Sequence, residues 1–328
     1  MKRSTAVLGT GALAGLTGAG LALFTARIAR RVDRALPPQG QFLDVGGARL
    51  HYIDEGSGPP VVLINGLGGH ARNFTHSLVA RLSGAFRVVV VERPGSGHSM
   101  RPRGASAALG AQADTVAEFI RKLGLERPLV VGHSLGGAVA LTLAVRHPDL
   151  VGGLALVSPL THVQETVPDV FRLMAIRSPR LRRLAAWTVA TPGALLRREA
   201  VLGTLFGPEP VPTDYATAGG GPLGLRPAAF YGASTDLMSV NDGLAEIIDQ
   251  YGSIGVPVGV LYGTGDQVLD HAVHGIAVAE KIPDLQLELV EGGHMLPLTA
   301  PAQVAAFITS VAQRMSAASA PSAELRSG

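Results

Sequence analysis

The chain has 328 residues, of which 47% are hydrophobic and 16% are charged, a balance that excludes an intrinsically disordered protein. Its formal net charge is only +3, and the basic excess lies in residues 1–36, where six basic residues stand against Asp33 alone. A nucleic-acid binder would spread basic residues over a folded face, so that class is not expected. The lack of cysteine excludes disulfides, thiolate catalysis and Cys-based zinc sites.

The first expected element is a membrane-spanning helix. No charged residue occurs from Ser4 to Ala26, and basic residues flank this run on both sides. A helix of that length reaches about 34 Å, which is enough to cross a hydrocarbon core. We therefore predict a single-pass membrane anchor and linker at residues 1–40, on an undetermined side of the membrane. A cleaved signal peptide is the alternative, although the end of the run has no typical cleavage site.

From residue 41 onwards, short apolar runs alternate with helical patterns. A hairpin around Gly46-Gly47 is expected first. The expected strands are 41–45, 48–54, 61–64, 87–91, 129–131, 154–157, 256–262 and 285–290, and the expected helices are near 72–82, 109–123, 135–147, 237–251, 272–281 and 301–314. This alternation predicts the α/β class, with a mostly parallel, doubly wound sheet of about eight strands and the hairpin at one edge.

One interval breaks the alternation. No buried strand is expected between residues 158 and 235, which is too long for a plain loop and predicts an inserted helical cap at 159–235. The α/β core is then 41–158 and 236–314, and 315–328 is a flexible tail. Within the cap, Phe171–Ala200 carries seven arginines against Glu199. This stretch is either a solvated face or a surface that lies against anionic lipid headgroups.

The strongest chemical signal is Gly132-His133-Ser134-Leu135-Gly136, where an apolar run turns into a helical pattern. A serine hydroxyl is a weak nucleophile unless a base takes its proton and a tight strand-turn-helix corner exposes it. The two glycines permit that corner, and the N-terminus of the following helix favours negative charge beside Ser134. We therefore predict Ser134 as a catalytic nucleophile.

A serine nucleophile needs a general base and a carboxylate that orients the base. His294 follows the last predicted strand and Asp266 follows the strand before it, so both reach the sheet edge at which Ser134 lies. The order Ser, Asp, His along the chain is the usual one behind a G-x-S-x-G corner. Asp270 is an alternative carboxylate.

Acyl transfer also needs hydrogen-bond donors for the oxyanion of the tetrahedral intermediate. The Gly-rich segment 65–69 follows the first central strand and can direct a backbone N–H into the site. We predict that the oxyanion hole consists of the backbone N–H groups of Leu67 and of Leu135, the residue after the nucleophile. This chemistry requires no metal ion and no organic cofactor.

Together, the corner at Ser134, the loop 65–69, the segment Glu92–Ser99, Asp266 and His294 resemble the α/β-hydrolase fold superfamily, in its lid-bearing esterase and lipase type. The resemblance covers residues 41–314 and implies a cap after the sixth strand. It extends to bacterial members with an N-terminal membrane anchor, which implies an inner-membrane location. Two positions depart from the family pattern, because Asn65 stands where His is usual and Glu92 where Asp is usual.

These features predict a membrane-anchored serine hydrolase that cleaves a carboxylic ester, including a lipid or acylglycerol, through an acyl-enzyme. Relatives with a carboxylate nucleophile, the haloalkane dehalogenases and epoxide hydrolases, do not fit Ser134. Amide, lactone and carbon–carbon bond hydrolases and cofactor-free perhydrolases or haloperoxidases are alternatives, since only the pocket lining separates them. A non-catalytic ligand-binding receptor is the alternative from another class. The sequence does not determine the oligomeric state.

Overall fold

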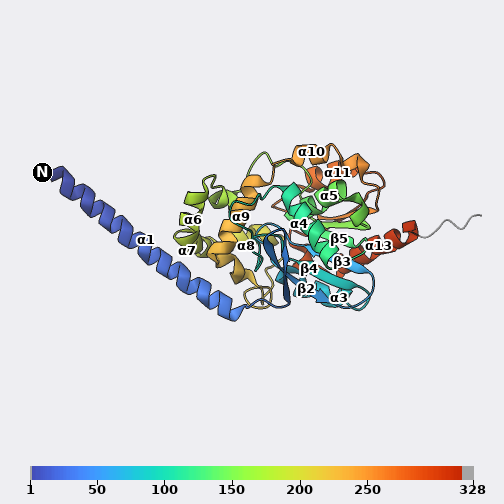
Figure 1. Ribbon diagram of the computed structural model, residues 1–328, viewed down its shortest axis with the longest axis horizontal. Coiled ribbons are helices and arrows are strands. Elements are labelled where there is room, and N and C mark those ends of the chain that lie inside the picture. The colour runs from blue at the N-terminus through green and yellow to red at the C-terminus, as the bar shows by residue number, and fades with distance from the viewer. Residues whose placement is uncertain (1, 320–328) are drawn as a thin grey trace, which may run out of the picture.

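The protein is built around an eight-stranded sheet (Figure 1). The computed structural model describes the backbone of residues 2–319 and the side chains of residues 15–318. The strands are β1 Gln41–Val45, β2 Ala48–Glu55, β3 Pro60–Ile64, β4 Arg87–Val91, β5 Leu129–His133, β6 Gly153–Val157, β7 Val258–Gly263 and β8 Gln286–Val290, in the spatial order β1-β2-β4-β3-β5-β6-β7-β8. The β1–β2 hairpin and β2–β4 are antiparallel and the other pairs are parallel, which confirms the predicted sheet.

Helices cover both faces of this sheet. The α-helices are α1 Lys2–Ala35, α2 Arg72–Thr75, α3 Leu78–Leu82, α4 Leu109–Lys122, α5 Leu135–Arg146, α6 Pro179–Trp187, α7 Ala190–Leu196, α8 Arg198–Phe206, α9 Pro227–Ser239, α10 Leu244–Ile248, α11 Ala277–Ala279, α12 Leu296–Thr299 and α13 Pro301–Ser319. Short 3₁₀ helices are η1 Pro148–Leu150, η2 Asp169–Met174, η3 Gly221–Leu225 and η4 Tyr251–Ser253, and η5 Ala272–Ile276 is a π-helix.

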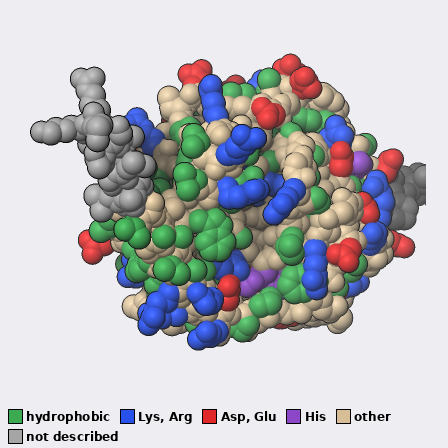
Figure 2. All heavy atoms as spheres, turned by 60° about the vertical axis from the view of Figure 1, so that its left-hand side comes forward, with side chains coloured by type: hydrophobic (Ala, Val, Ile, Leu, Met, Phe, Trp, Pro, Cys, Tyr) green, Lys and Arg blue, Asp and Glu red, His purple; other side chains and the backbone are tan. Residues whose placement is uncertain are grey.

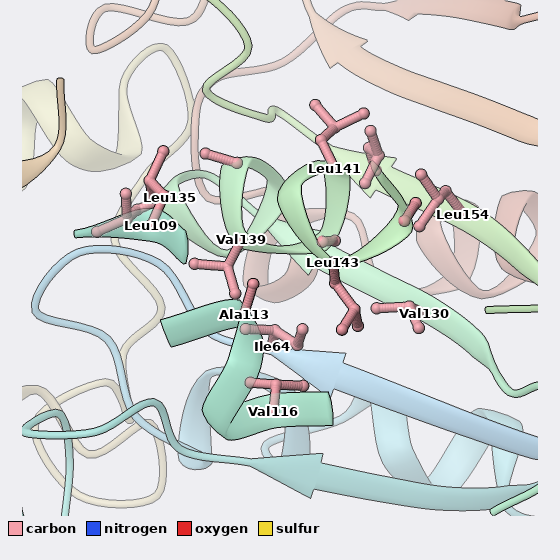
Figure 3. Close-up of a cluster of buried hydrophobic side chains, with 14 of the residues drawn as sticks. Ile64, Leu109, Ala113, Val116, Val130, Leu135, Val139, Leu141, Leu143 and Leu154 are labelled. Atoms are coloured by element: carbon pink, nitrogen blue, oxygen red, sulfur yellow. The ribbon is translucent and has the colours of Figure 1, made fainter. Parts of the chain in front are cut away.

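Side chains that alternate along each strand show which helices pack on each face of the sheet. Val62 and Ile64 of β3 belong to one apolar cluster with α4 and α5, whereas Val61 and Leu63 belong to another with α3 and α13. Successive strand side chains point to opposite faces, so these two clusters are the two sides of the sheet. In Figure 3, Val139 and Leu143 of α5 lie among side chains of the sheet and of α4. This packing fixes α5, which begins directly after Ser134.

The N-terminal helix α1 runs beside the helices inserted after β6 (Figure 1). Val32 and Leu36 of α1 pack with Leu223 in a small apolar cluster. Of the helices in the described part of the chain, none is long and apolar enough to cross a lipid bilayer. The predicted transmembrane helix at 4–26 is therefore not supported. The glycines at 15, 18 and 20 add no apolar side chain to α1, and the side chains of residues 4–14 lie outside the described residues.

The segment between β6 and β7 contains η2, α6, α7, α8, η3, α9, α10 and η4, and no strand among its described residues. The assignment of 159–235 to a separate cap stays a prediction. The expected helix at 237–251 is wrong in its bounds, because Pro227 starts α9 earlier and left-handed Gly243 (φ +77°) separates it from α10. The predicted tail 315–328 overlaps the end of α13, and its residues 320–328 lie outside the described ones.

The corner before α5 leaves no room for side chains at its glycines. A Cβ atom on Gly132 would lie 2.5 Å from the carbonyl oxygen of Gly136, and one on Gly136 would lie 2.2 Å from the carbonyl oxygen of Ile64. Both contacts are with backbone, which cannot rotate away as a side chain can. The start of α5 and the end of β3 are therefore in direct backbone contact.

This contact predicts opposite effects for two Gly-to-Ala substitutions in helices. Gly136→Ala should destabilise the protein by about 1–3 kcal/mol or more, because the added methyl group must displace backbone. Gly203→Ala in α8, where a Cβ meets nothing within 4 Å, should stabilise it by about 0.5–1 kcal/mol. Urea unfolding midpoints measure both effects. Equal shifts in the two variants would contradict the rigid contact.

Candidate active site

Ser134 occupies the turn between β5 and α5 in a strained conformation. Its φ and ψ are 55° and −123°, values that a residue with a side chain rarely adopts. The turn is held because the Ser134 N–H donates to the Val157 carbonyl at 3.1 Å and the Ser134 carbonyl accepts from Gly137 at 2.8 Å. The geometry matches the corner that the sequence pattern predicts for a nucleophilic serine.

His294 and Asp266 meet in the loops after β8 and β7. The Nδ1–H of His294 donates to Asp266 Oδ2 at 2.7 Å, and the Asp266 side chain is fully buried. The other carboxylate oxygen accepts from the backbone N–H groups of Val268 at 2.8 Å and Leu269 at 3.0 Å. Burial raises the pKa of Asp266, but the charge and hydrogen bond of His294 and these N–H donors outweigh it and lower the pKa. Asp266 is therefore a carboxylate at neutral pH.

The alternative carboxylate, Asp270, does not contact His294 through any hydrogen bond in the structure. Its Oδ1 accepts from the Ala272 N–H at 2.8 Å, and its side chain is 63% exposed. Since Nδ1 of His294 donates to Asp266, Nε2 carries the free lone pair in the neutral form of the imidazole. That nitrogen is the one a general base would use.

His133, the residue before the predicted nucleophile, supports the His294 loop. Its Nε2–H donates to the His294 carbonyl oxygen at 2.9 Å, and the two imidazole rings are 5.0 Å apart. Burial, together with the neighbouring His294, lowers the pKa of His133 to about 3, so it is neutral at physiological pH. No sequence pattern predicted this role, although the position of His133 beside Ser134 was a usable signal.

Glu209, from the segment inserted after β6, also holds the His294 loop. Its Oε2 accepts from the Gly293 N–H at 2.9 Å, and a Cβ on Gly293 would lie 2.1 Å from the Gly207 carbonyl oxygen. The inserted segment is thus in backbone contact with the residue before His294. No local sequence pattern marks Glu209, because its partner lies 84 residues away.

The predicted oxyanion loop lies against Ser134 and is shaped by Arg93. A Cβ on Gly66 would be 2.8 Å from the Ser134 Cβ. The fully buried guanidinium of Arg93 donates through Nε to the Asn65 carbonyl and through Nη2 to the Gly66 carbonyl, both at 2.7 Å. In a trans peptide the N–H points opposite to the C=O, so the Leu67 N–H is directed away from Arg93.

The same guanidinium ties this loop to the inserted helix α9. Nη1 of Arg93 donates to Gln112 Oε1 and to Asp236 Oδ2, each at 2.7 Å. Asp236 is 1% exposed, and its second oxygen accepts from Arg101 at 2.5 Å. One buried carboxylate therefore neutralises two arginines between the core and α9. The segment Glu92–Ser99 contains Arg93, but no sequence pattern predicted its role in this contact or marked Asp236.

The two departures from the family pattern are accommodated by hydrogen bonds. Asn65 accepts from the Arg93 N–H at 3.0 Å and donates to Ser96 Oγ at 3.2 Å. Buried Glu92 accepts from the Ala71 N–H at 2.8 Å and lies 3.0 Å from Nδ1 of His51. Burial opposes ionisation of Glu92, but His51 and the backbone donors lower its pKa below the usual range. Both residues fix the loop rather than face a substrate.

The predicted site residues come together at one cavity of about 370 Å³, which Ser134, His294, Leu67 and Leu135 all line. The rest of its lining is mostly apolar and includes Leu160, Val167, Phe171, Leu205, Leu237, Met238, Val240, Val268, Leu269 and Met295. The polar side chains that line it include His70, Asn73, Gln164, Glu165, Arg177 and Asn241. Asp266 stands behind His294. Within the described residues, no group of three or more His, Asp or Glu has the arrangement of a metal site.

Residues 59–301 match the family model described as alpha/beta hydrolase fold. An uncharacterized protein of Mycobacterium tuberculosis is 30% identical over 273 residues, which cover 82% of this chain and 79% of that protein. The 2-(acetamidomethylene)succinate hydrolase of Mesorhizobium japonicum is 27% identical, over 76% of this chain and 86% of that enzyme. The crystal structure of a thermophilic esterase from Thermogutta terrifontis superposes with a TM-score of 0.66 at 23% identity, over 84% of this chain and 99% of that one.

The Arg93–Asp236 contact predicts a large effect for a residue far from Ser134 in sequence. Asp236→Ala should lower the free energy of unfolding by about 3–5 kcal/mol, because the buried Arg93 and the largely buried Arg101 lose their carboxylate. Asp114→Ala is a matched control, since its Arg146 pair is about half exposed and should cost less than about 1 kcal/mol. Denaturant unfolding measures both. An equal, small loss in the two variants would show that Asp236 does not hold α9 to the core.

Proposed function

The chain belongs to the alpha/beta hydrolase fold family, and on that premise we propose that it is a serine hydrolase that cleaves carboxylic esters through an acyl-enzyme. The observation that carries the proposal is the 2.7 Å hydrogen bond between His294 and a buried Asp266 at a cavity that Ser134 also lines. An oriented imidazole with a free Nε2 is the base that a serine hydroxyl requires.

In this mechanism Ser134 Oγ bonds to the ester carbonyl carbon while His294 Nε2 takes the hydroxyl proton. The Asp266 carboxylate stabilises the imidazolium that forms. His294 then gives the proton to the departing alcohol as the carbon–oxygen bond of the ester breaks. A water molecule then bonds to the acyl carbon while His294 Nε2 takes one of its protons. His294 gives that proton to Ser134 Oγ as the bond between the acyl carbon and Oγ breaks, which releases the carboxylic acid and restores the Ser134 hydroxyl.

The negative oxygen of each tetrahedral intermediate would accept from the backbone N–H groups of Leu67 and Leu135. Two observations support this assignment. Both residues line the cavity with Ser134. The hydrogen bond from Arg93 to the Gly66 carbonyl also directs the N–H of the same peptide group, that of Leu67, away from Arg93. Leu135 begins α5, so its N–H is one of the unpaired donors of a helix N-terminus.

The cavity lining favours an ester with an apolar acyl group. Most of its side chains are aliphatic or aromatic, and its volume falls within the usual range for small-molecule sites. Ser134 at the corner, in place of a carboxylate, favours hydrolysis through a serine ester over dehalogenation or epoxide opening. Esters of moderate length, lipid esters among them, are therefore the substrate class that we propose.

The direct test is turnover of p-nitrophenyl esters of increasing acyl length by the full chain and by its Ser134→Ala variant. We expect turnover in the parent, with an optimum at an intermediate chain length, and none above background in the variant. A fluorophosphonate probe should label only the parent. A folded parent with neither turnover nor labelling would contradict the proposal and favour the ligand-receptor alternative.

The role of Asp266 has its own test, because Asp270 provides a matched control. Asp266→Asn should reduce kcat by about 10⁴-fold, since an amide cannot stabilise the imidazolium and favours the wrong tautomer of His294. Asp270→Asn, at an exposed position, should leave kcat within about twofold of the parent. Steady-state kinetics of both variants, with the ester that the parent cleaves fastest, measures the two effects on kcat. The reverse order of effects would make Asp270 the functional carboxylate.

A further inference from the structure

Exposed apolar side chains gather on the inserted helices α6 and α7. Leu181 and Leu184 of α6 are 59% and 60% exposed, Leu196 of α7 is 87% exposed, and Trp187 and Val189 between them are 46% and 56% exposed. Figure 2 shows hydrophobic side chains gathered on this face. Contiguous apolar patches of this kind mark interaction surfaces, whereas single exposed apolar residues are ordinary.

Helical geometry shows that these leucines are not displaced core residues. The inward side of α6 carries Arg182 and Ala186, four residues apart and both buried. The Arg182 guanidinium donates to Thr235 Oγ1 of α9 at 2.8 Å and to the Ile176 carbonyl at 2.7 Å. Since Arg182 fixes which side of α6 faces the protein, Leu181 and Leu184 face solvent.

The N-terminal helix α1 extends the same face. It contacts both α6 and α7, and its Leu23 and Phe24 are 69% and 42% exposed. The C-terminal half of α1 contacts the inserted segment. Asp33 Oδ1 lies 3.5 Å from Arg226 Nη1, and Val32 packs on Leu223. The exposed apolar side chains of α1 therefore lie on a helix that packs directly beside α6 and α7.

Arginines accompany this apolar patch with few carboxylates. The sequence from Arg177 to Arg198 contains six arginines and no Asp or Glu, and five of these arginines are exposed. On α1, Arg27, Arg30, Arg31 and Arg34 are also exposed. Apolar side chains beside a high density of cationic groups are the combination that binds the interface of an anionic bilayer.

We propose that α6, α7 and the adjoining part of α1 form a docking face for the surface of an anionic lipid bilayer. Leu181, Leu184, Trp187 and Leu196 enter the boundary between headgroups and acyl chains, and the arginines bind lipid phosphates. A second copy of the chain fits less well, because a two-fold contact would bring these uncompensated arginines together. Arg177 also lines the active-site cavity, so the docking face adjoins that cavity.

The single tryptophan of the chain, Trp187, reports on this face directly. The full chain should show a saturable blue shift of tryptophan emission with vesicles that contain equal parts of phosphatidylcholine and phosphatidylglycerol, and a weaker one with phosphatidylcholine alone. High salt should weaken the binding, because the screening length falls from about 8 Å at physiological salt to about 3 Å at 1 M. No shift with either vesicle, or equal binding to both, would overturn the proposal.

Two variants separate the docking face from general surface effects. The Arg180→Gln, Arg183→Gln double variant should bind anionic vesicles about 30-fold more weakly. Leu184→Ser with Leu196→Ser should also weaken binding, whereas Met100→Ser with Leu289→Ser, which alters exposed apolar residues elsewhere, should not. Equal losses in the two serine pairs would overturn the proposal. The proposal would also be overturned if the Leu184→Ser, Leu196→Ser variant bound vesicles as the parent does but lost a dimer that the parent forms in sedimentation. That result would assign the face to contact with a second copy of the chain.

The docking proposal does not depend on the proposed catalysis. Ser134→Ala should bind the vesicles as the parent does, because Ser134 is not part of the face. A protein that binds vesicles but has no esterase activity would support docking and contradict the proposed catalysis. A protein with esterase activity that does not bind vesicles would contradict docking and support the proposed catalysis. A Ser134→Ala protein that folds normally but no longer shows the blue shift would contradict a separate docking face.

Discussion

The buried guanidinium of Arg93 is the contact on which the arrangement of this molecule depends. A charge that is removed from water must find hydrogen bonds and a counter-charge, and Arg93 finds them in two carbonyl groups, Gln112 and Asp236. These partners come from the loop beside Ser134, from α4 and from α9. Satisfying one charge therefore positions three parts of the chain together.

The segment inserted after β6 does more than cover the cavity. Asp236 joins it to the loop on one side of Ser134, and Glu209 joins it to the loop of His294 on the other. Because Asp236 pairs with both Arg93 and Arg101, and Glu209 accepts from the Gly293 N–H, the inserted segment and the two loops constrain each other. The shape of the cavity is thus a property of the core and the insertion together.

Local patterns were enough to predict most of the sheet and the position of the candidate site. Short Val-rich runs predict parallel strands, and the glycines on both sides of Ser134 predict a tight corner. Both predictions rest on neighbouring residues alone. Contacts such as Arg93 with Asp236 could not be predicted, because they join residues 143 positions apart. The transmembrane prediction lacks support for another reason. An uncharged run satisfies the length that a membrane requires, but glycine supplies little apolar surface.

The glycines at 66, 132 and 136 also limit how the protein can change over evolution. Glycine is the smallest amino acid, so every mutation there adds atoms to a space that backbone or Ser134 already fills. Such positions cannot drift through a series of nearly neutral steps, unlike the aliphatic cavity walls, where leucine, valine and methionine can replace one another. Substrate range in this lineage can therefore diversify through the walls of the cavity while the corner beneath Ser134 stays the same.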